Sequence, residues 1–153
     1  LNELKEPVSL TALLSTIRTS IKNIIEQENV DFNLSGIQVD EIYSLRSYMH
    51  SIFLNLVTNS IKYRRPNQLL KIAIDSSTEN EKLTIRYKDN GRGIDLDKHG
   101  DNVFGLYKRF HRDIEGKGVG LFMIKTQTEI LGGKVELLSA VDEGVEFTFE
   151  FNL

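Results

Sequence analysis

The feature that most constrains the fold is the spacing of apolar residues, which switches between two periods along the chain. Over residues 10–27 and 44–64, apolar side chains recur every three or four positions, which places them on one face of a helix. Ser9 or Thr11 can cap the start of the first segment, and Pro66 stops the second. The sequence therefore predicts two amphipathic helices in these ranges.

Between and after these helices, apolar residues alternate with polar ones. Alternation over 70–74 and 83–87, on either side of a polar turn, predicts a hairpin of two half-buried strands. The remaining expected elements are a second hairpin over 134–139 and 145–151, weaker extended segments near 30–34 and 37–42, and a third helix after Gly120. Helices that cover one face of a mixed, mostly antiparallel sheet would make a two-layer α/β sandwich.

Composition limits the classes of partner. The chain has 153 residues, a net charge of −3 and a pI near 5.7, so it lacks the overall basic field that binds nucleic acid or an anionic membrane. It has no cysteine, which excludes disulfides, a thiolate nucleophile and cysteine-ligated metal. No apolar run is long enough to span a bilayer, and no signal peptide is evident. We expect one cytoplasmic domain, residues 1–153, belonging to a longer protein because it begins without Met.

Four polar residues gather on one side of the second predicted helix. Asn55, Asn59, Lys62 and Tyr63 recur at i, i+4, i+7 and i+8. Two amide oxygens can help to hold Mg²⁺, which takes its other ligands from water and phosphate, and Lys62 adds a positive charge. Taken alone, this pattern is more often the solvated face of an amphipathic helix.

Two glycine-rich segments follow. Asp89-Asn90-Gly91-Arg92-Gly93-Ile94 comes directly after an alternating strand, and its carboxylate can accept a hydrogen bond from an exocyclic amine such as that of adenine. Gly116-Lys117-Gly118-Val119-Gly120-Leu121 leads into a helix, and its backbone N–H groups can cradle phosphate. Either segment by itself also fits an ordinary turn.

The connection between these segments fits neither period. Residues 91–118 are rich in glycine and charged side chains, with one short apolar cluster over 103–110. A connection this long in a compact domain is typical of a functional loop. We expect residues 95–117 to form a lid that is mobile without nucleotide and closes over the phosphates, with the apolar cluster docking on the nucleotide site or an upstream partner.

The order of these segments resembles the ATP-binding catalytic domain of sensor histidine kinases, a Bergerat-type fold shared with gyrase, MutL and a class of ATPase chaperones. Residues 55–63 resemble the family's N box, 89–93 its first glycine box, 104–110 its F box and 116–121 its second glycine box. The resemblance covers nearly the whole chain and implies ATP and Mg²⁺ as ligands.

The resemblance also implies roles for individual residues. It implies that Asn59 and Asn55 bind Mg²⁺ and that Lys62 reaches phosphate. It implies that Asp89 binds the adenine amino group, with Tyr63 against the adenine or ribose. The other residues expected at the nucleotide are Gly91, Gly93, Ile94, Tyr107, Arg109, Lys117, Gly118, Val119, Gly120 and Leu121.

Position 55 bears on the reaction. Hydrolytic relatives carry a water-activating Glu four residues before the magnesium-binding Asn, whereas Asn55 has no useful basicity. The resemblance therefore implies phosphoryl transfer by positioning and charge, with Asn55, Lys62 and Arg109 as catalytic residues. None of the three histidines is followed by an acidic residue and a later proline, the family's phosphoacceptor pattern. The acceptor is expected on dimerisation helices of the full-length protein, with a response regulator downstream.

Two positions depart from the family pattern. Tyr107 occupies the second aromatic position of the F box, and Val145 stands where many relatives have a Thr near the adenine. Three other functions stay open: a nucleotide-binding regulatory module without productive transfer, an ATPase of the chaperone, gyrase or MutL kind, and an anti-sigma serine kinase.

Overall fold

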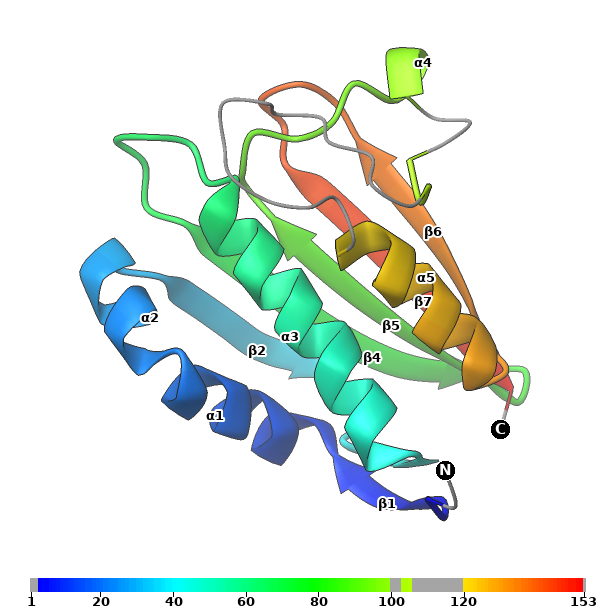
Figure 1. Ribbon diagram of the computed structural model, residues 1–153. Coiled ribbons are helices and arrows are strands. Elements are labelled where there is room, and N and C mark those ends of the chain that lie inside the picture. The colour runs from blue at the N-terminus through cyan, green and yellow to red at the C-terminus, as the bar shows by residue number, and fades with distance from the viewer. Residues whose placement is uncertain (1–2, 100–102, 106–119, 153) are drawn as a thin grey trace.

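The main sheet has five strands, and helices pack on one of its faces (Figure 1). The computed structural model describes residues 3–99, 103–105 and 120–152. The helices are α1 (Leu10–Ser20), α2 (Lys22–Glu28), α3 (Arg46–Lys62), α4 (Leu96–His99) and α5 (Gly120–Ile130). The strands are β1 (Glu6–Ser9), β2 (Asp31–Ile37), β3 (Glu41–Ser44), β4 (Lys71–Glu79), β5 (Lys82–Asp89), β6 (Lys134–Ser139) and β7 (Val145–Asn152). The predicted two-layer α/β fold is confirmed.

Strand order in the main sheet is β2-β4-β5-β7-β6. The β4–β5 and β6–β7 hairpins form as predicted, β5 and β7 also pair antiparallel, and β2 runs parallel to β4. The small antiparallel ribbon of β1 and β3 was not predicted. Each of its strands has four residues, too few to show an alternating pattern in the sequence.

The core lies between the sheet and the helices. Every second residue of β5 faces it, so Leu83, Ile85 and Tyr87 are each at most 1% exposed. Across from them, α3 contributes Phe53, whose ring lies 6.3 Å from that of Phe149 on β7. Burial of these apolar faces holds the two layers together and fixes the position of α3 over β5.

The helix predicted over residues 10–27 is two helices, so that prediction was wrong in detail. Ser9 caps the first, its Oγ accepting from the backbone N–H of Ala12 at 3.2 Å. The Ser20 hydroxyl donates to the carbonyl of Ile17 (2.8 Å), and Ile21 leaves helical geometry with φ −113° and ψ 22°. The break therefore lies at Ile21, although its N–H still donates to the carbonyl of Ile17 at 3.1 Å. None of the helices described is both long and apolar enough to cross a membrane.

Candidate functional site

Five elements bring their ends together at one edge of the sheet, which we call the Asp89 end. Strand β5 ends at Asp89, β6 ends at Ser139 and β7 begins at Val145. The C-terminal end of α3 and the N-terminal end of α5 lie on the same side (Figure 1). Most of the described residues that the sequence assigned to nucleotide binding lie on these ends.

Asp89 is a buried carboxylate, only 6% exposed. Its Oδ1 accepts hydrogen bonds from the backbone N–H groups of Gly91 (2.9 Å) and Val145 (3.1 Å). Its Oδ2 accepts one from Ser60 Oγ at 2.6 Å. Burial raises the pKa of Asp89 above its ordinary value, and these three hydrogen bonds oppose that rise. In the described part of the chain its hydrogen-bond partners are all uncharged, so neutral dipoles hold the carboxylate.

Two glycines allow close backbone packing around the end of β5 and the turn between β6 and β7. Gly144 has φ +77°, and a Cβ there would lie 2.0 Å from the carbonyl oxygen of Asp89. Gly93 has φ +70°, and a Cβ there would lie 2.0 Å from the carbonyl oxygen of Ala140. Any side chain at either position would clash with backbone, so both turns require glycine. The second glycine of the D-x-G-x-G segment is thus explained by space as well as by conformation.

Two polar side chains fasten the loop that follows Asp89. Asn90 accepts from the backbone N–H of Lys71 (2.8 Å) and donates to the carbonyl of Leu69 (2.9 Å). Arg65 donates from Nε to the carbonyl of Asn90 and from Nη1 to that of Asp142, each at 2.9 Å. These bonds tie the loop both to the start of β4 and to the turn between β6 and β7.

The amide side of α3 meets the start of α5. A Cβ at Gly120 would lie 2.9 Å from Asn59 Nδ2 and 3.1 Å from its Oδ1, so Gly120 leaves room for that amide. Asn55 lies one turn earlier on α3 and is half-buried, whereas Lys62 is exposed in the last turn. Tyr63 follows the helix, and its carbonyl accepts from the N–H of Arg92 at 2.9 Å.

Two further predicted residues take part in packing around the site. Ile94 is buried, and its N–H donates to Ser139 Oγ (2.8 Å), which itself donates to the carbonyl of Gly144 (2.5 Å). Leu121 packs against the hydrophobic core. Their backbone positions border the site, while their side chains support it.

Five predicted site residues lie outside the described residues: Tyr107, Arg109, Lys117, Gly118 and Val119. Most of the predicted lid lies there too, so its closure stays a prediction. The described parts are α4 and residues 103–105. Within them Phe104 packs against the core, with Lys125 Nζ 5.9 Å from its ring centroid.

Sequence reasoning missed Ser60 and Tyr87, which join Asp89 in one hydrogen-bonded group. A signal for Ser60 was present, because it lies three and four residues after Val57 and Leu56 on the apolar face of its helix. A serine at such a position needs a buried partner. Ser60 also connects Asp89 to the amide side of α3, because it bonds to Asp89 and its neighbour Asn59 faces Gly120.

The oxygen atoms at this site suit a metal ion that takes most of its ligands from a bound molecule and from water. Among the described residues, no group of three or more His, Asp or Glu side chains could hold a metal ion. The amides of Asn55 and Asn59 offer neutral oxygens at i, i+4 spacing. Mg²⁺ bound through such amides would take its remaining ligands from phosphate and water.

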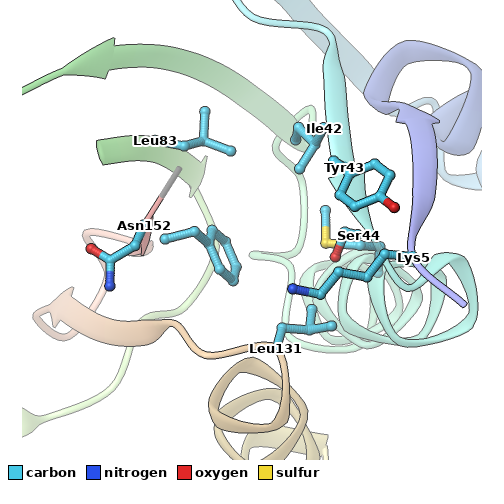
Figure 2. A pocket seen from close by; sticks show the side chains of 9 residues that line it. Lys5, Ile42, Tyr43, Ser44, Leu83, Leu131 and Asn152 are labelled. Carbon is cyan, nitrogen blue, oxygen red and sulfur yellow. The ribbon is translucent and has the colours of Figure 1, made fainter. Parts of the chain in front are cut away.

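A separate hollow lies at the opposite end of β5 and β7 (Figure 2). Its volume is about 230 Å³. It is lined by Lys5, Ile42, Tyr43, Ser44, Met49, Leu83, Leu131, Phe151 and Asn152. This lining includes none of the residues that the sequence assigned to nucleotide binding, so the Asp89 end is the candidate site.

Known proteins share sequence and fold with this chain. The family model "Histidine kinase-, DNA gyrase B-, and HSP90-like ATPase" matches residues 45–153. Cyanobacterial phytochrome B from Nostoc sp. is 30% identical over 94% of the chain, and the methanogenesis regulatory histidine kinase FilI from Methanothrix harundinacea is 36% identical over 59%. The chain spans only 19% and 10% of the length of these two relatives.

A solved structure shares the fold over nearly its whole length. The mycobacterial sensor histidine kinase MprB superposes with a TM-score of 0.77 at 19% identity, covering 97% of each chain. The arrangement of helices and strands is therefore similar even where few residues are identical.

Proposed function

The chain belongs to the family of histidine kinase-, DNA gyrase B- and HSP90-like ATPases, and we propose that it is the ATP-binding domain of a sensor histidine kinase. Domains of this family bind ATP. In our proposal the domain donates the γ-phosphoryl group of ATP to a histidine on a separate dimerisation and phosphoacceptor domain. A response regulator would then receive it.

The observation that carries this proposal is Asp89. Two backbone N–H groups and one hydroxyl hold this buried carboxylate at the glycine-lined edge of the sheet. A carboxylate accepts hydrogen bonds and donates none, so it suits the amino group of adenine. We assign Gly91, Gly93 and Tyr63 to the surroundings of the base, and Asp89 to its recognition.

The phosphates belong, in our proposal, beside Asn59 and Gly120. The N-terminal end of α5 carries the positive end of its helix dipole, which favours negative charge. Asn55 and Asn59 would hold Mg²⁺, which neutralises phosphate charge and orients the γ-phosphate when bound. Lys62 would bind phosphate, and we propose the same for Arg109, Lys117 and Gly118 in the second half of the loop.

The transfer step needs an acceptor from outside the described residues. An acceptor imidazole nitrogen would form the bond to the γ-phosphorus while that phosphorus loses its bond to the bridging oxygen, releasing ADP. His50 lies nine residues before Asn59 on α3. That is about 13 Å along the helix axis, and His99 lacks the acidic residue that follows the family's phosphoacceptor, so we place the acceptor on another domain.

Asn55 argues for transfer rather than hydrolysis. A neutral amide cannot take a proton from water at neutral pH, so the described part of α3 supplies no general base at this position. We therefore expect the isolated domain to release phosphate from ATP slowly.

A transfer assay tests the proposal. The domain is mixed with γ-labelled ATP, Mg²⁺ and a separately made helical segment that carries the acceptor histidine. We expect label on that segment that acid removes and alkali leaves, and much less of it with Asn59→Ala. Asn152→Ala, an exposed amide far from Asp89, is the matched control. Acid-stable label, fast hydrolysis without an acceptor, or ATP binding without transfer would each contradict it.

A further inference from the structure

Behind Asp89 lies a pair of buried hydroxyl groups that family membership does not explain. Tyr87 Oη is 2.7 Å from Ser60 Oγ, and Ser60 Oγ is 2.6 Å from Asp89 Oδ2. The exposed fractions are 0% for Tyr87 and 3% for Ser60. The three side chains form a continuous hydrogen-bonded row from the core between α3 and β5 to the edge of the sheet.

The direction of each hydrogen bond in this row follows from Asp89, the carboxylate at one end of it. Ionised Asp89 has no proton to give, so Ser60 donates to it. A serine hydroxyl has a single proton, so Tyr87 must donate to Ser60. Hydrogen bonds that point the same way strengthen one another in a low-dielectric interior. The whole row therefore directs donors at Asp89 Oδ2.

Asp89 has few hydrogen-bond acceptor positions left for a ligand, and their orientation is fixed. A carboxylate has about four acceptor positions. Among the described residues, Gly91 and Val145 occupy two on Oδ1, and Ser60 occupies one on Oδ2. About one acceptor position is left for a ligand, in an orientation fixed by the other three bonds.

We propose that the Tyr87–Ser60 hydroxyl pair holds Asp89 as an acceptor-only carboxylate and thereby sets a preference for 6-aminopurine over 6-oxopurine nucleotides. This inference rests on the proposed function, because it concerns the base that Asp89 binds. An amino group at C6 donates to the carboxylate, whereas an oxo group presents a second acceptor to it. A carboxyl group that can rotate or carry a proton loses this discrimination. Ser60 and Tyr87 are thus positioning residues that act through Asp89.

The test compares ATP with inosine triphosphate, which has an oxo group at C6 and a hydrogen on N1 and is otherwise built like ATP. Affinities of both are measured by calorimetry for the wild-type domain, Ser60→Ala, Ser60→Thr and Tyr87→Phe. We expect Ser60→Ala to lower the ATP-to-ITP affinity ratio about tenfold and Tyr87→Phe about threefold, as expected for hydrogen bonds that serve a charged group. Ser60→Thr keeps the hydroxyl and should restore most of the ratio.

Ser76 on β4 offers a matched control. It is 1% exposed, and its Oγ donates to the carbonyl of Val39 (2.6 Å) and accepts from its N–H (3.1 Å). Ser76→Ala therefore also removes a buried hydroxyl with two bonds, and it should leave the ratio unchanged. Tyr87→Phe keeps the buried ring, so it carries the test even if Ser60→Ala fails to fold.

Each outcome decides between the proposals. An unchanged ratio in Ser60→Ala and Tyr87→Phe, with both affinities lowered in parallel, overturns this inference and leaves the proposed function intact. An equal fall in the ratio for Ser76→Ala overturns it as well. A wild-type domain that binds ATP and ITP equally contradicts both the adenine assignment and the inference.

Discussion

The two ends of the β5–β7 pair each hold a carboxylate, but by opposite means. At the Asp89 end the carboxylate is buried among uncharged donors, and burial raises its pKa. At the far end, Glu150 lies between Lys82 Nζ (3.3 Å) and Lys134 Nζ (3.5 Å), and the hydrogen bond from Lys82 and the two positive charges lower its pKa. Two cations compensate the charge of Glu150, whereas the uncharged donors around Asp89 leave its charge uncompensated and about one acceptor position open to a ligand.

The largest effect should come from Gly144 at the Asp89 end. Gly144→Ala places a Cβ 2.0 Å from the carbonyl oxygen of Asp89, so we expect a loss of about 3 kcal/mol of unfolding free energy and of ATP binding. Gly132→Ala is the control, since Gly132 has φ +81° with no atom within 4 Å of its Cβ position. It should cost about 1 kcal/mol and leave ATP binding unchanged. Equal effects in urea denaturation would show that close approach to Asp89 is unimportant.

Removing the charge of Asp89 should have the next largest effect. In Asp89→Asn, the Gly91 and Val145 N–H groups keep the amide oxygen, and the new NH₂ group faces Ser60 Oγ and the ligand amine. Two donors then oppose each other, so ATP affinity should fall about fiftyfold by calorimetry. An affinity within about threefold of wild type would place the base elsewhere.

The stability that each carboxylate contributes should depend on pH with opposite signs. Glu150 has a lowered pKa, so its contribution is present at higher pH and is lost as pH falls. Asp89 has a folded-state pKa above its ordinary value of 3.8, so it stabilises the fold at low pH and this contribution is lost as pH rises through that pKa. ATP affinity should show the reverse trend, falling as Asp89 gains a proton. In urea denaturation at pH values below and above the folded-state pKa of Asp89, the Asp89→Asn variant should gain stability relative to wild type as pH rises. A difference in unfolding free energy between variant and wild type that stays constant with pH would contradict a raised pKa for Asp89.

The smallest effect is expected at the far end. Glu150→Gln removes the partly exposed partner of two surface lysines, so Tm should fall by at most about 2 °C at low salt and less at high salt. ATP affinity should not change. A loss of ATP affinity comparable to that of Asp89→Asn would contradict the claim that only the Asp89 end of the β5–β7 pair binds nucleotide.

The sequence predicted much of this site because its signals are local. Asp89 directly follows an alternating strand, and Asn55 and Asn59 share a helix face by spacing alone. The partners of Asp89 were not predictable in this way. Val145 donates through its backbone, which carries no side-chain signal, and Ser60 meets Asp89 only because α3 packs over β5. The break at Ile21 is a local change of backbone angles that the period of apolar residues does not register.

A nuclear magnetic resonance titration with Mg-ADP tests most directly whether the Asp89 end binds nucleotide. The backbone amides of Gly91 and Val145, which donate to Asp89, should shift strongly on addition of ligand. The amides of Lys82 and Glu150, at the far end of the same strands, should stay in place. Shifts that cluster instead around Leu83 and Phe151, in the lining of the far hollow, would contradict the assignment of the site.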